Sequence, residues 1–459
     1  MIILLTIIPM NIWIRVGLVI LSALLGVLAF PPFGRSVFWL LIVVAWVPLF
    51  IALSGLTVRG AFYAGLGQGV LLYGVCLSWL WGLFGPSSVA LWIIVGAFIG
   101  LTCSLIVALR LSGLLGSMMG AAIWVGCEFF RSEIYALHFP WITPGTGLPP
   151  TWLSPIVGVY GVSFLVIFGS LLIREKMTLR VIGGCILAVL LVSGFLKFSS
   201  DKGNIRVLAI QNEQGSFENK MAQTMDAFDG HDVVIWPELG MGSTVRETDR
   251  AKEKLLEFSH EKQALFVGGG YQESGEELAY NSAFTLDVGV EVGTHFKNKP
   301  VPLFKDGKKG TEAKAIKTNL GLIGTPICFD CDHESVIRKM VADGAEVILA
   351  PSLDAIHWSE RQHDQHAEIF RHRAAENRRW IAVAASSGRT QIIDKYGNRV
   401  ATIPLIEAGV LEGSISFETG RTFYNRFGWL TGWICFAISS GALLYVLIKS
   451  IAKKMDRSR

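Results

Sequence analysis

Three polar side chains in the middle of the chain lie at positions where an α/β domain would place reactive groups. Glu238 follows the apolar run 233–236, Lys297 lies in a basic, proline-rich stretch, and Cys328 follows the apolar run that begins at residue 321. A carboxylate at the carboxyl end of a strand lies at the edge where ligands bind. A cysteine between a strand and a helix gains from the helix N-terminal amides and becomes a candidate nucleophile. Each residue alone also has a plain explanation: a capping acid, a solvated lysine, a buried structural cysteine.

Redox and metal chemistry are the alternatives at the cysteine. Cys328 and Cys331 have CxxC spacing, but thioredoxin-type motifs stand near the start of a small domain, and the chain has no second CxxC to complete a zinc site. A histidine run follows, whose spacings of six, three and six do not place three ligands on one helical face; solvated or packing histidines are favoured. We therefore expect no metal and no cofactor. The run consists of His357, His363, His366 and His372.

The elements that must position these residues begin near residue 204. Short β-branched runs alternate there with polar, helix-like stretches, which indicates an α/β domain covered on both faces. No glycine-rich phosphate loop follows any strand, so nucleotide chemistry has no support. The predicted strands are 205–210, 233–236, 265–268, 282–286, 321–328, 347–350 and 381–385, and the predicted helices are 251–262 and 362–378.

The rest of the chain has a membrane composition. Hydrophobic residues make up 51% of the 459 residues and charged residues only 17%, which excludes a simple soluble protein. The charges concentrate in the middle, whose net charge is negative, and this argues against nucleic acid as a partner. We predict a membrane domain at 1–200 with about seven transmembrane helices, a catalytic domain at 204–424, and a last transmembrane helix with a basic cytoplasmic tail at 425–459.

Lysine and arginine in the short loops set the predicted orientation, because cytoplasmic loops carry an excess of both. Loops rich in lysine and arginine alternate with loops that are poor in both. The middle domain therefore follows the seventh predicted span on the side opposite to the basic loops. In a bacterium this places it on the periplasmic side of the inner membrane, with both termini cytoplasmic. The predicted spans are 12–31, 36–55, 61–83, 88–109, 114–132, 151–173, 180–198 and 428–448.

The loop at about 133–150 is rich in proline, glycine and aromatic residues, which suits a re-entrant or interfacial segment. Trp141 is either an ordinary interfacial anchor or part of a lipid-contacting wall. Glu128, at the end of the fifth predicted span, is a candidate substrate contact, since intramembrane carboxylates are functional candidates; pairing with Arg131 is the alternative.

Taken together, the three polar stretches resemble the carbon–nitrogen hydrolase (nitrilase) superfamily, which uses a Glu-Lys-Cys triad. The order Glu238, Lys297, Cys328 matches. A nitrilase-like domain behind seven spans and ahead of one more resembles the apolipoprotein N-acyltransferases. The further stretches that carry the resemblance are 28–34, 127–131, 139–141, 350–354, 365–366, 371–377, 385–390 and 393–397.

The resemblance implies an α-β-β-α sandwich and a mechanism. Glu238 would be the general base, Lys297 would stabilise the oxyanion, and Cys328 would be the nucleophile. A phospholipid would donate an acyl chain to Cys328 as a thioester. The α-amino group of the N-terminal diacylglyceryl-cysteine of an apolipoprotein would then accept it.

The chain departs from the family at three places. That family usually has a second glutamate after the lysine loop; Lys305 stands at that register here, and Asp306 is either its stand-in or a solvated loop acid. Phe329 and Asp330 follow the nucleophile and keep an aromatic and an acid as candidate supporting residues. The loop 351–358 also differs from the family's usual sequence.

Two other functions use the same features. The first is a membrane-tethered amidohydrolase, in which water replaces the amine in the second step. The second is a non-catalytic lipoprotein-binding protein built on the same fold. The nature of the acceptor separates the first from an acyltransferase, and the absence of any acyl-thioester on the cysteine would favour the second.

Overall fold

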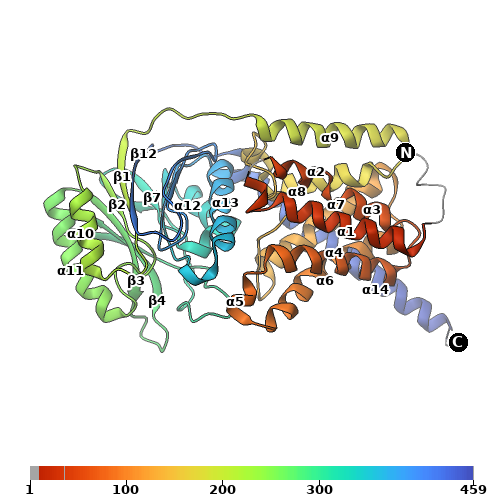
Figure 1. Cartoon of the computed structure of the whole chain (residues 1–459), viewed down its shortest axis with the longest axis horizontal. Coiled ribbons are helices and arrows are strands. Elements are labelled where there is room, and N and C mark those ends of the chain that lie inside the picture. The colour runs from red at the N-terminus through yellow and green to blue at the C-terminus, as the bar shows by residue number, and fades with distance from the viewer. Residues whose placement is uncertain (1–9, 36, 458–459) are drawn as a thin grey trace. The chain divides into compact units, whose positions relative to one another are not determined.

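The computed structural model describes residues 10–35 and 37–457 and divides the chain into two compact units (Figure 1). The first unit contains the described residues up to Pro149, together with Val159–Phe195 and the chain from Leu430 onward. The second contains Pro150–Gly158 and Leu196–Trp429. Each unit is described by itself.

The first unit is helical. Within the described residues, six helices are long and apolar enough to cross a membrane, as expected for a membrane domain. They are α1 (Ile12–Ala29), α6 (Ser87–Ala108), α7 (Gly113–Phe129) with its π-helical extension (Phe130–Ile134), α8 (Ser154–Leu172), α9 (Met177–Phe195) and α14 (Leu430–Arg457). The residues of α8 up to Gly158 belong to the second unit.

Two of the predicted spans differ from single long apolar helices. The segment predicted at 36–55 is divided into the short helices η3 (Phe38–Leu41), α2 (Ile42–Ala45) and α3 (Val47–Ala52), the last with Pro48 in its first turn. The segment predicted at 61–83 forms α4 (Val58–Cys76) and the short α5 (Leu80–Phe84). Polar residues and repeated glycines interrupt the apolar sequence of α4, which is not among the six candidate spans.

Glycines allow α4 and α6 to pack closely. A Cβ on Gly69 would lie 2.6 Å from the Cα of Gly96, and a Cβ on Gly65 would lie 2.9 Å from the Cα of Gly100. The two glycines of each helix are four residues apart and therefore share one face. This is the small-residue contact by which apolar helices associate in membranes, where no hydrophobic force drives them together.

The second unit contains two six-stranded sheets. Their strand orders are β12-β1-β2-β3-β4-β5 and β11-β10-β9-β8-β7-β6. The strands are β1 (Ile205–Gln211), β2 (Val233–Ile235), β3 (Leu265–Gln272), β4 (Tyr280–Asp287), β5 (Val290–Phe296), β6 (Ile316–Lys317), β7 (Leu322–Gly324), β8 (Val347–Ser352), β9 (Ile381–Ala385), β10 (Gln391–Ile393), β11 (Arg399–Thr402) and β12 (Gly409–Ile415).

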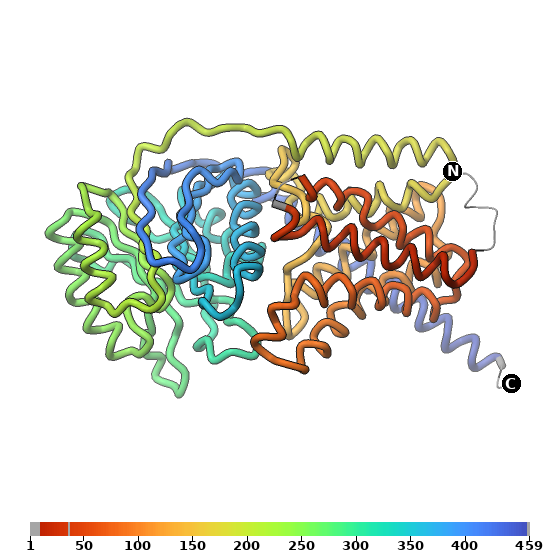
Figure 2. Tube along the Cα trace, viewed as in Figure 1, coloured from red at the N-terminus to blue at the C-terminus, as the bar shows by residue number. Residues whose placement is uncertain are grey.

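The sheets pack face to face, and helices cover their outer faces. One apolar cluster joins both sheets and includes Val207, Val233, Val347 and Ala382. A second joins the first sheet to α10 (Phe217–Ala227) and α11 (Val245–Lys262), which run side by side in Figure 2. A third joins the second sheet to α12 (Glu334–Ala342) and α13 (Glu360–Asn377). The unit is therefore the α-β-β-α sandwich that the resemblance implied.

All seven predicted strands and both predicted helices are present; β9 has the predicted bounds, and the others differ at one end or both. The predicted strand 321–328 is the largest discrepancy, because β7 ends at Gly324 and Pro326 follows it. Alternation of buried and exposed residues was too weak to predict β5, whose first three residues are all exposed. That strand positions the candidate lysine.

Candidate active site

Each member of the predicted triad follows the carboxyl end of a strand. Glu238 comes three residues after β2, and Lys297 follows β5 directly. Because β5 is antiparallel to β4, and β4 to β3, β5 runs parallel to β3 and β2, so both side chains lie at the same edge of the first sheet. Cys328 follows β7 of the second sheet and begins the short helix η5 (Cys328–Asp332).

Glu238, Lys297 and Asp306 form one buried charge cluster. The Nζ of Lys297 lies 2.8 Å from Oε1 of Glu238 and 2.7 Å from Oδ2 of Asp306. The Lys297 and Glu238 side chains are each 1% exposed and that of Asp306 is 12% exposed. The sequence left open whether Asp306 was a solvated acid; its carboxylate instead binds the candidate lysine.

A residue that the sequence did not single out completes this cluster. Asn281 of β4 donates its amide to Glu238 Oε1 at 2.6 Å and to Asp306 Oδ1 at 2.8 Å. The second oxygen of Asp306 accepts a hydrogen bond from the Val301 amide at 2.8 Å. Asn281 is fully buried, but β4 also carries the buried polar residues Ser282, Thr285 and Asp287, so the sequence pattern of this strand does not single it out.

The pKa directions describe the resting cluster. Burial raises the pKa of the Glu238 carboxyl, against the opposing effect of Lys297, so it is a better proton acceptor than an exposed carboxylate. Burial also opposes the charge on Lys297, but the carboxylates of Glu238 and Asp306 outweigh it and raise the lysine pKa well above its usual value. Lys297 therefore keeps its positive charge at neutral pH.

Cys328 is buried in a small apolar cluster with Ala283, Ile327 and Phe329. Its φ of 48° is in the left-handed region, which is costly for a residue with a side chain and recurs at functional sites. The thiol donates to the Leu353 carbonyl at 3.5 Å. Burial, and then the charge of Glu238, raise the thiol pKa well above its usual value, while Lys297 lowers it. The thiol is therefore neutral at rest and needs a base.

Asp330 and Phe329 lie in the turn that carries the nucleophile. The Asp330 carboxylate accepts hydrogen bonds from the backbone amides of Asn298 at 2.9 Å and Lys299 at 2.8 Å, and contacts His295 Nε2 at 2.9 Å. It thus ties η5 to the segment immediately after Lys297. Phe329 is 7% exposed and packs edge-on against the ring of His333.

The two cysteines of the CxxC pair lie in different surroundings. Cys331 is fully buried in the cluster between the second sheet and α13, with Val336 and Phe370. Both thiols are free. Among residues 10–35 and 37–457, no group of three or more histidine, cysteine or acidic residues could hold a metal ion.

Of the two interpretations that the sequence favoured, solvated or packing histidines, the histidines of α13 follow the second. His363 and His366 are buried. His366 lies between two carboxylates, with Nδ1 2.7 Å from Asp354 and Nε2 3.3 Å from Asp332. Asp332 and Asp354 come from distant segments, and only the fold brings them to His366. The sequence pattern alone therefore does not reveal this contact.

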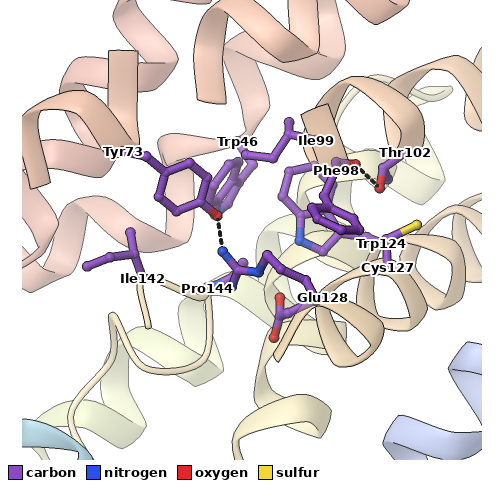
Figure 3. A pocket seen from close by; sticks show the side chains of 11 residues that line it. Trp46, Tyr73, Phe98, Ile99, Thr102, Trp124, Cys127, Glu128, Ile142 and Pro144 are labelled. Atoms are coloured by element: carbon purple, nitrogen blue, oxygen red, sulfur yellow. Dashed lines mark hydrogen bonds between the residues drawn. The ribbon is translucent and has the colours of Figure 1, made fainter. Parts of the chain in front are cut away.

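Glu128 and Trp141 lie in the first unit. Glu128 lines a cavity of about 20 Å³, enough for one water molecule (Figure 3). Glu128 is buried and accepts a hydrogen bond from Ser163 at 2.8 Å. Arg131 donates to the Tyr73 hydroxyl at 2.6 Å and to the Trp141 carbonyl at 3.2 Å. Trp141 is itself 4% exposed, so within this unit its ring packs inside rather than on the surface.

Two family models match the chain. The model described as Carbon-nitrogen hydrolase matches residues 207–424, and the model described as Apolipoprotein N-acyltransferase N-terminal domain matches residues 22–172. Together these matches include most of both units.

Similar proteins match more than nine tenths of the chain. The Apolipoprotein N-acyltransferase of Geobacter metallireducens is 27% identical, covering 91% of this chain and 92% of that protein. The protein of the same name from Pseudomonas aeruginosa strain UCBPP-PA14 is 24% identical, covering 94% and 95%. Among solved structures, a carbon-nitrogen hydrolase from Helicobacter pylori G27 is 17% identical with a TM-score of 0.41, covering 46% of this chain and 88% of that one.

Proposed function

Because the chain belongs to the apolipoprotein N-acyltransferase family, we propose that it moves an acyl chain from a phospholipid to the α-amino group of the diacylglyceryl-cysteine at an apolipoprotein N-terminus. The observation that carries this proposal is the buried cluster of Glu238, Lys297 and Asp306, in which the charges of Glu238 and Lys297 act on the Cys328 thiol. A neutral buried thiol, a carboxylate of raised pKa and a permanent cation are the groups that acyl transfer requires.

In the first step, Glu238 takes the proton of the Cys328 thiol, and the thiolate attacks the ester carbonyl of the phospholipid. Lys297 stabilises the oxyanion of the tetrahedral intermediate. The intermediate collapses to an acyl-thioester, and the departing alkoxide of the lysophospholipid takes the proton from Glu238. Asp306 and Asn281 hold this pair in place, because Asp306 contacts Lys297 and Asn281 donates to Glu238 and to Asp306.

In the second step, the α-amino group of the acceptor attacks the thioester. Glu238 takes a proton from the attacking nitrogen, and Lys297 again stabilises the oxyanion. The amide forms as the carbon–sulfur bond breaks, and the leaving thiolate recovers its proton from Glu238. The second step therefore regenerates the neutral thiol of the resting site.

The proposed location is the bacterial inner membrane, with the second unit on the periplasmic side. The long apolar helices support membrane insertion. Both substrates carry acyl chains, so a membrane-anchored catalytic domain can reach each of them without extracting it into water.

Replacing the two cysteines separately tests the proposal. Cys328→Ala removes the nucleophile, and we expect no acyl-thioester and no N-acylated lipopeptide. Cys331→Ala is the matched control, because its thiol lies in the apolar cluster behind η5, and we expect most of the activity to remain. The measurement is mass spectrometry of the protein and of a diacylglyceryl lipopeptide after incubation with phospholipid.

Three outcomes would contradict the proposal. Equal loss from both substitutions would favour redox chemistry at the CxxC pair. Release of free fatty acid without N-acylated lipopeptide would make the protein a hydrolase. A wild-type protein that forms no acyl-thioester with any donor would indicate a non-catalytic role.

A further inference from the structure

The nucleophile is held by two segments that come from different parts of the second unit. One is the turn Cys328–Asp332 itself. The other is the segment after β8, where the Leu353 carbonyl accepts the hydrogen bond of the Cys328 thiol at 3.5 Å. Any movement of one segment against the other changes the direction of the sulfur.

One side chain of α13 contacts both segments. His366 Nε2 lies 3.3 Å from Oδ1 of Asp332, the last residue of η5, and its Nδ1 lies 2.7 Å from Oδ1 of Asp354, the residue after Leu353. The three side chains are almost wholly buried, with exposed fractions of 2%, 0% and 4%. A cation between two buried carboxylates satisfies charges that would otherwise be costly to bury.

We propose that His366 is a positioning residue for thioester formation, which as a protonated imidazolium ties the nucleophile turn 328–332 to the segment 353–354. This inference rests on the proposed acyl transfer at Cys328 and adds a residue to it. His366 acts through Asp332 and Asp354 and does not itself touch the reacting atoms.

The charged groups around His366 come from three other segments and from α13 itself. The acids are Asp332 of η5, Asp354 after β8 and Glu238 after β2. On α13 itself the neighbours are His363 and Arg373. Arg373 donates to the carbonyls of Cys331 and Asp332. Burial opposes protonation, but Asp354 and Asp332 outweigh it and raise the pKa of His366 to about 9. The folded-state pKa is raised, so the stabilising charge is present at neutral pH and is lost as the pH rises through about 9.

This predicts an alkaline fall in the rate of Cys328 acylation with a midpoint near pH 9. The pKa values of Cys328 and Lys297 are raised well above their usual values, so their own titrations lie at higher pH. His366→Gln keeps a hydrogen-bonding side chain but removes the charge. We expect acylation at pH 7 to be slower by about 10- to 100-fold, the usual cost of a small misplacement, and the fall near pH 9 to disappear.

His363→Gln is the matched control. It lies one turn earlier on the same helix and is also buried, but its Nε2 contacts the Ala355 carbonyl at 3.0 Å, and its effect on Asp354 is smaller than that of His366. We expect this variant to keep the alkaline fall.

Asp332→Asn provides a second test that leaves His366 in place: with one carboxylate removed, the fall should move to lower pH.

The measurement is the rate of acyl-thioester formation on Cys328 in the full-length protein between pH 7 and pH 10, followed by intact mass, with a phospholipid and with p-nitrophenyl acetate. The inference is overturned if His366→Gln keeps the wild-type rate and the wild-type alkaline fall, or if Asp332→Asn leaves the midpoint unchanged. Acylation of the wild type by p-nitrophenyl acetate but not by phospholipid would instead overturn the proposed donor, and the small ester would still test His366.

Discussion

At the scale of single residues, the candidate site depends on one ammonium shared by two carboxylates. Lys297 contacts Glu238 and Asp306 at nearly equal distances, while Asn281 bridges the two acids. Glu238, Lys297 and Cys328 could be recognised from the sequence as candidate catalytic residues, because each follows an apolar run or lies in a motif. The roles of Asp306 and Asn281 could not, because their contacts depend on how the loop after Lys297 turns back, which includes Gly307 at a φ of 92°.

Replacing Asp306 tests this shared arrangement. In Asp306→Asn the ammonium of Lys297 loses one of two charged partners, so we expect slower thioester formation by about 10-fold, while Glu238→Gln should lose about 10²–10⁴ because it removes the base. Lys305→Ala, in the same loop and exposed, is the control and should be unchanged. The measurement is the rate of Cys328 acylation; wild-type rates in Asp306→Asn would show that the second carboxylate is dispensable.

At the scale of elements, strands buried on both faces could be predicted and edge strands could not. The continuous apolar runs of β1, β2, β8 and β9 lie in the interior of the sandwich. In contrast, β5 is the edge of its sheet and begins with three exposed residues, so its pattern resembles that of a loop. The sequence pattern therefore suggests a flexible segment around Lys297. In the structure, β5 ends directly before Lys297 and fixes its position.

The close approach of Gly269 in β3 to the backbone after β2 gives a prediction at the scale of elements. A Cβ at Gly269 would lie 2.5 Å from the Cα of Glu238 and 2.7 Å from the Leu239 nitrogen, which are backbone atoms. Gly269→Ala must therefore displace the base, and we expect thioester formation to fall by about 10²-fold. In Gly270→Ala the new Cβ meets the side chain of Thr248 instead, so this variant should lose stability, by about 1–3 kcal/mol, and keep more activity. The two variants are compared by thermal unfolding and by acylation rate, and equal rates would contradict the argument.

At the scale of the whole molecule, composition separates an apolar helical unit from a charged α/β unit, and that separation could be predicted from the sequence. The grouping of Pro150–Gly158 with the second unit could not. It depends on contacts between distant residues, such as the close approach of Gly158 to Tyr424 and of Gly397 to Pro150. A hydropathy pattern contains no information about such contacts, because it is local.

Orientation in the membrane is the prediction that belongs to the whole molecule. Five long apolar helices precede residue 196 among those described, and seven segments do so when α4 and the 38–52 region are counted, so the number is odd in either case. The loop between α8 and α9 carries Arg174 and Lys176, and Arg180 follows in the first turn of α9, which predicts that this loop is cytoplasmic. A phosphatase fused after residue 200 should therefore be active outside the cytoplasm, while a fluorescent protein fused after residue 459 should fold inside it. A phosphatase fused after residue 176 is the control and should be inactive. If the fusion at residue 200 were also inactive and a fluorescent protein there were bright, the catalytic unit would face the cytoplasm, and the proposed access to periplasmic lipoproteins would be wrong.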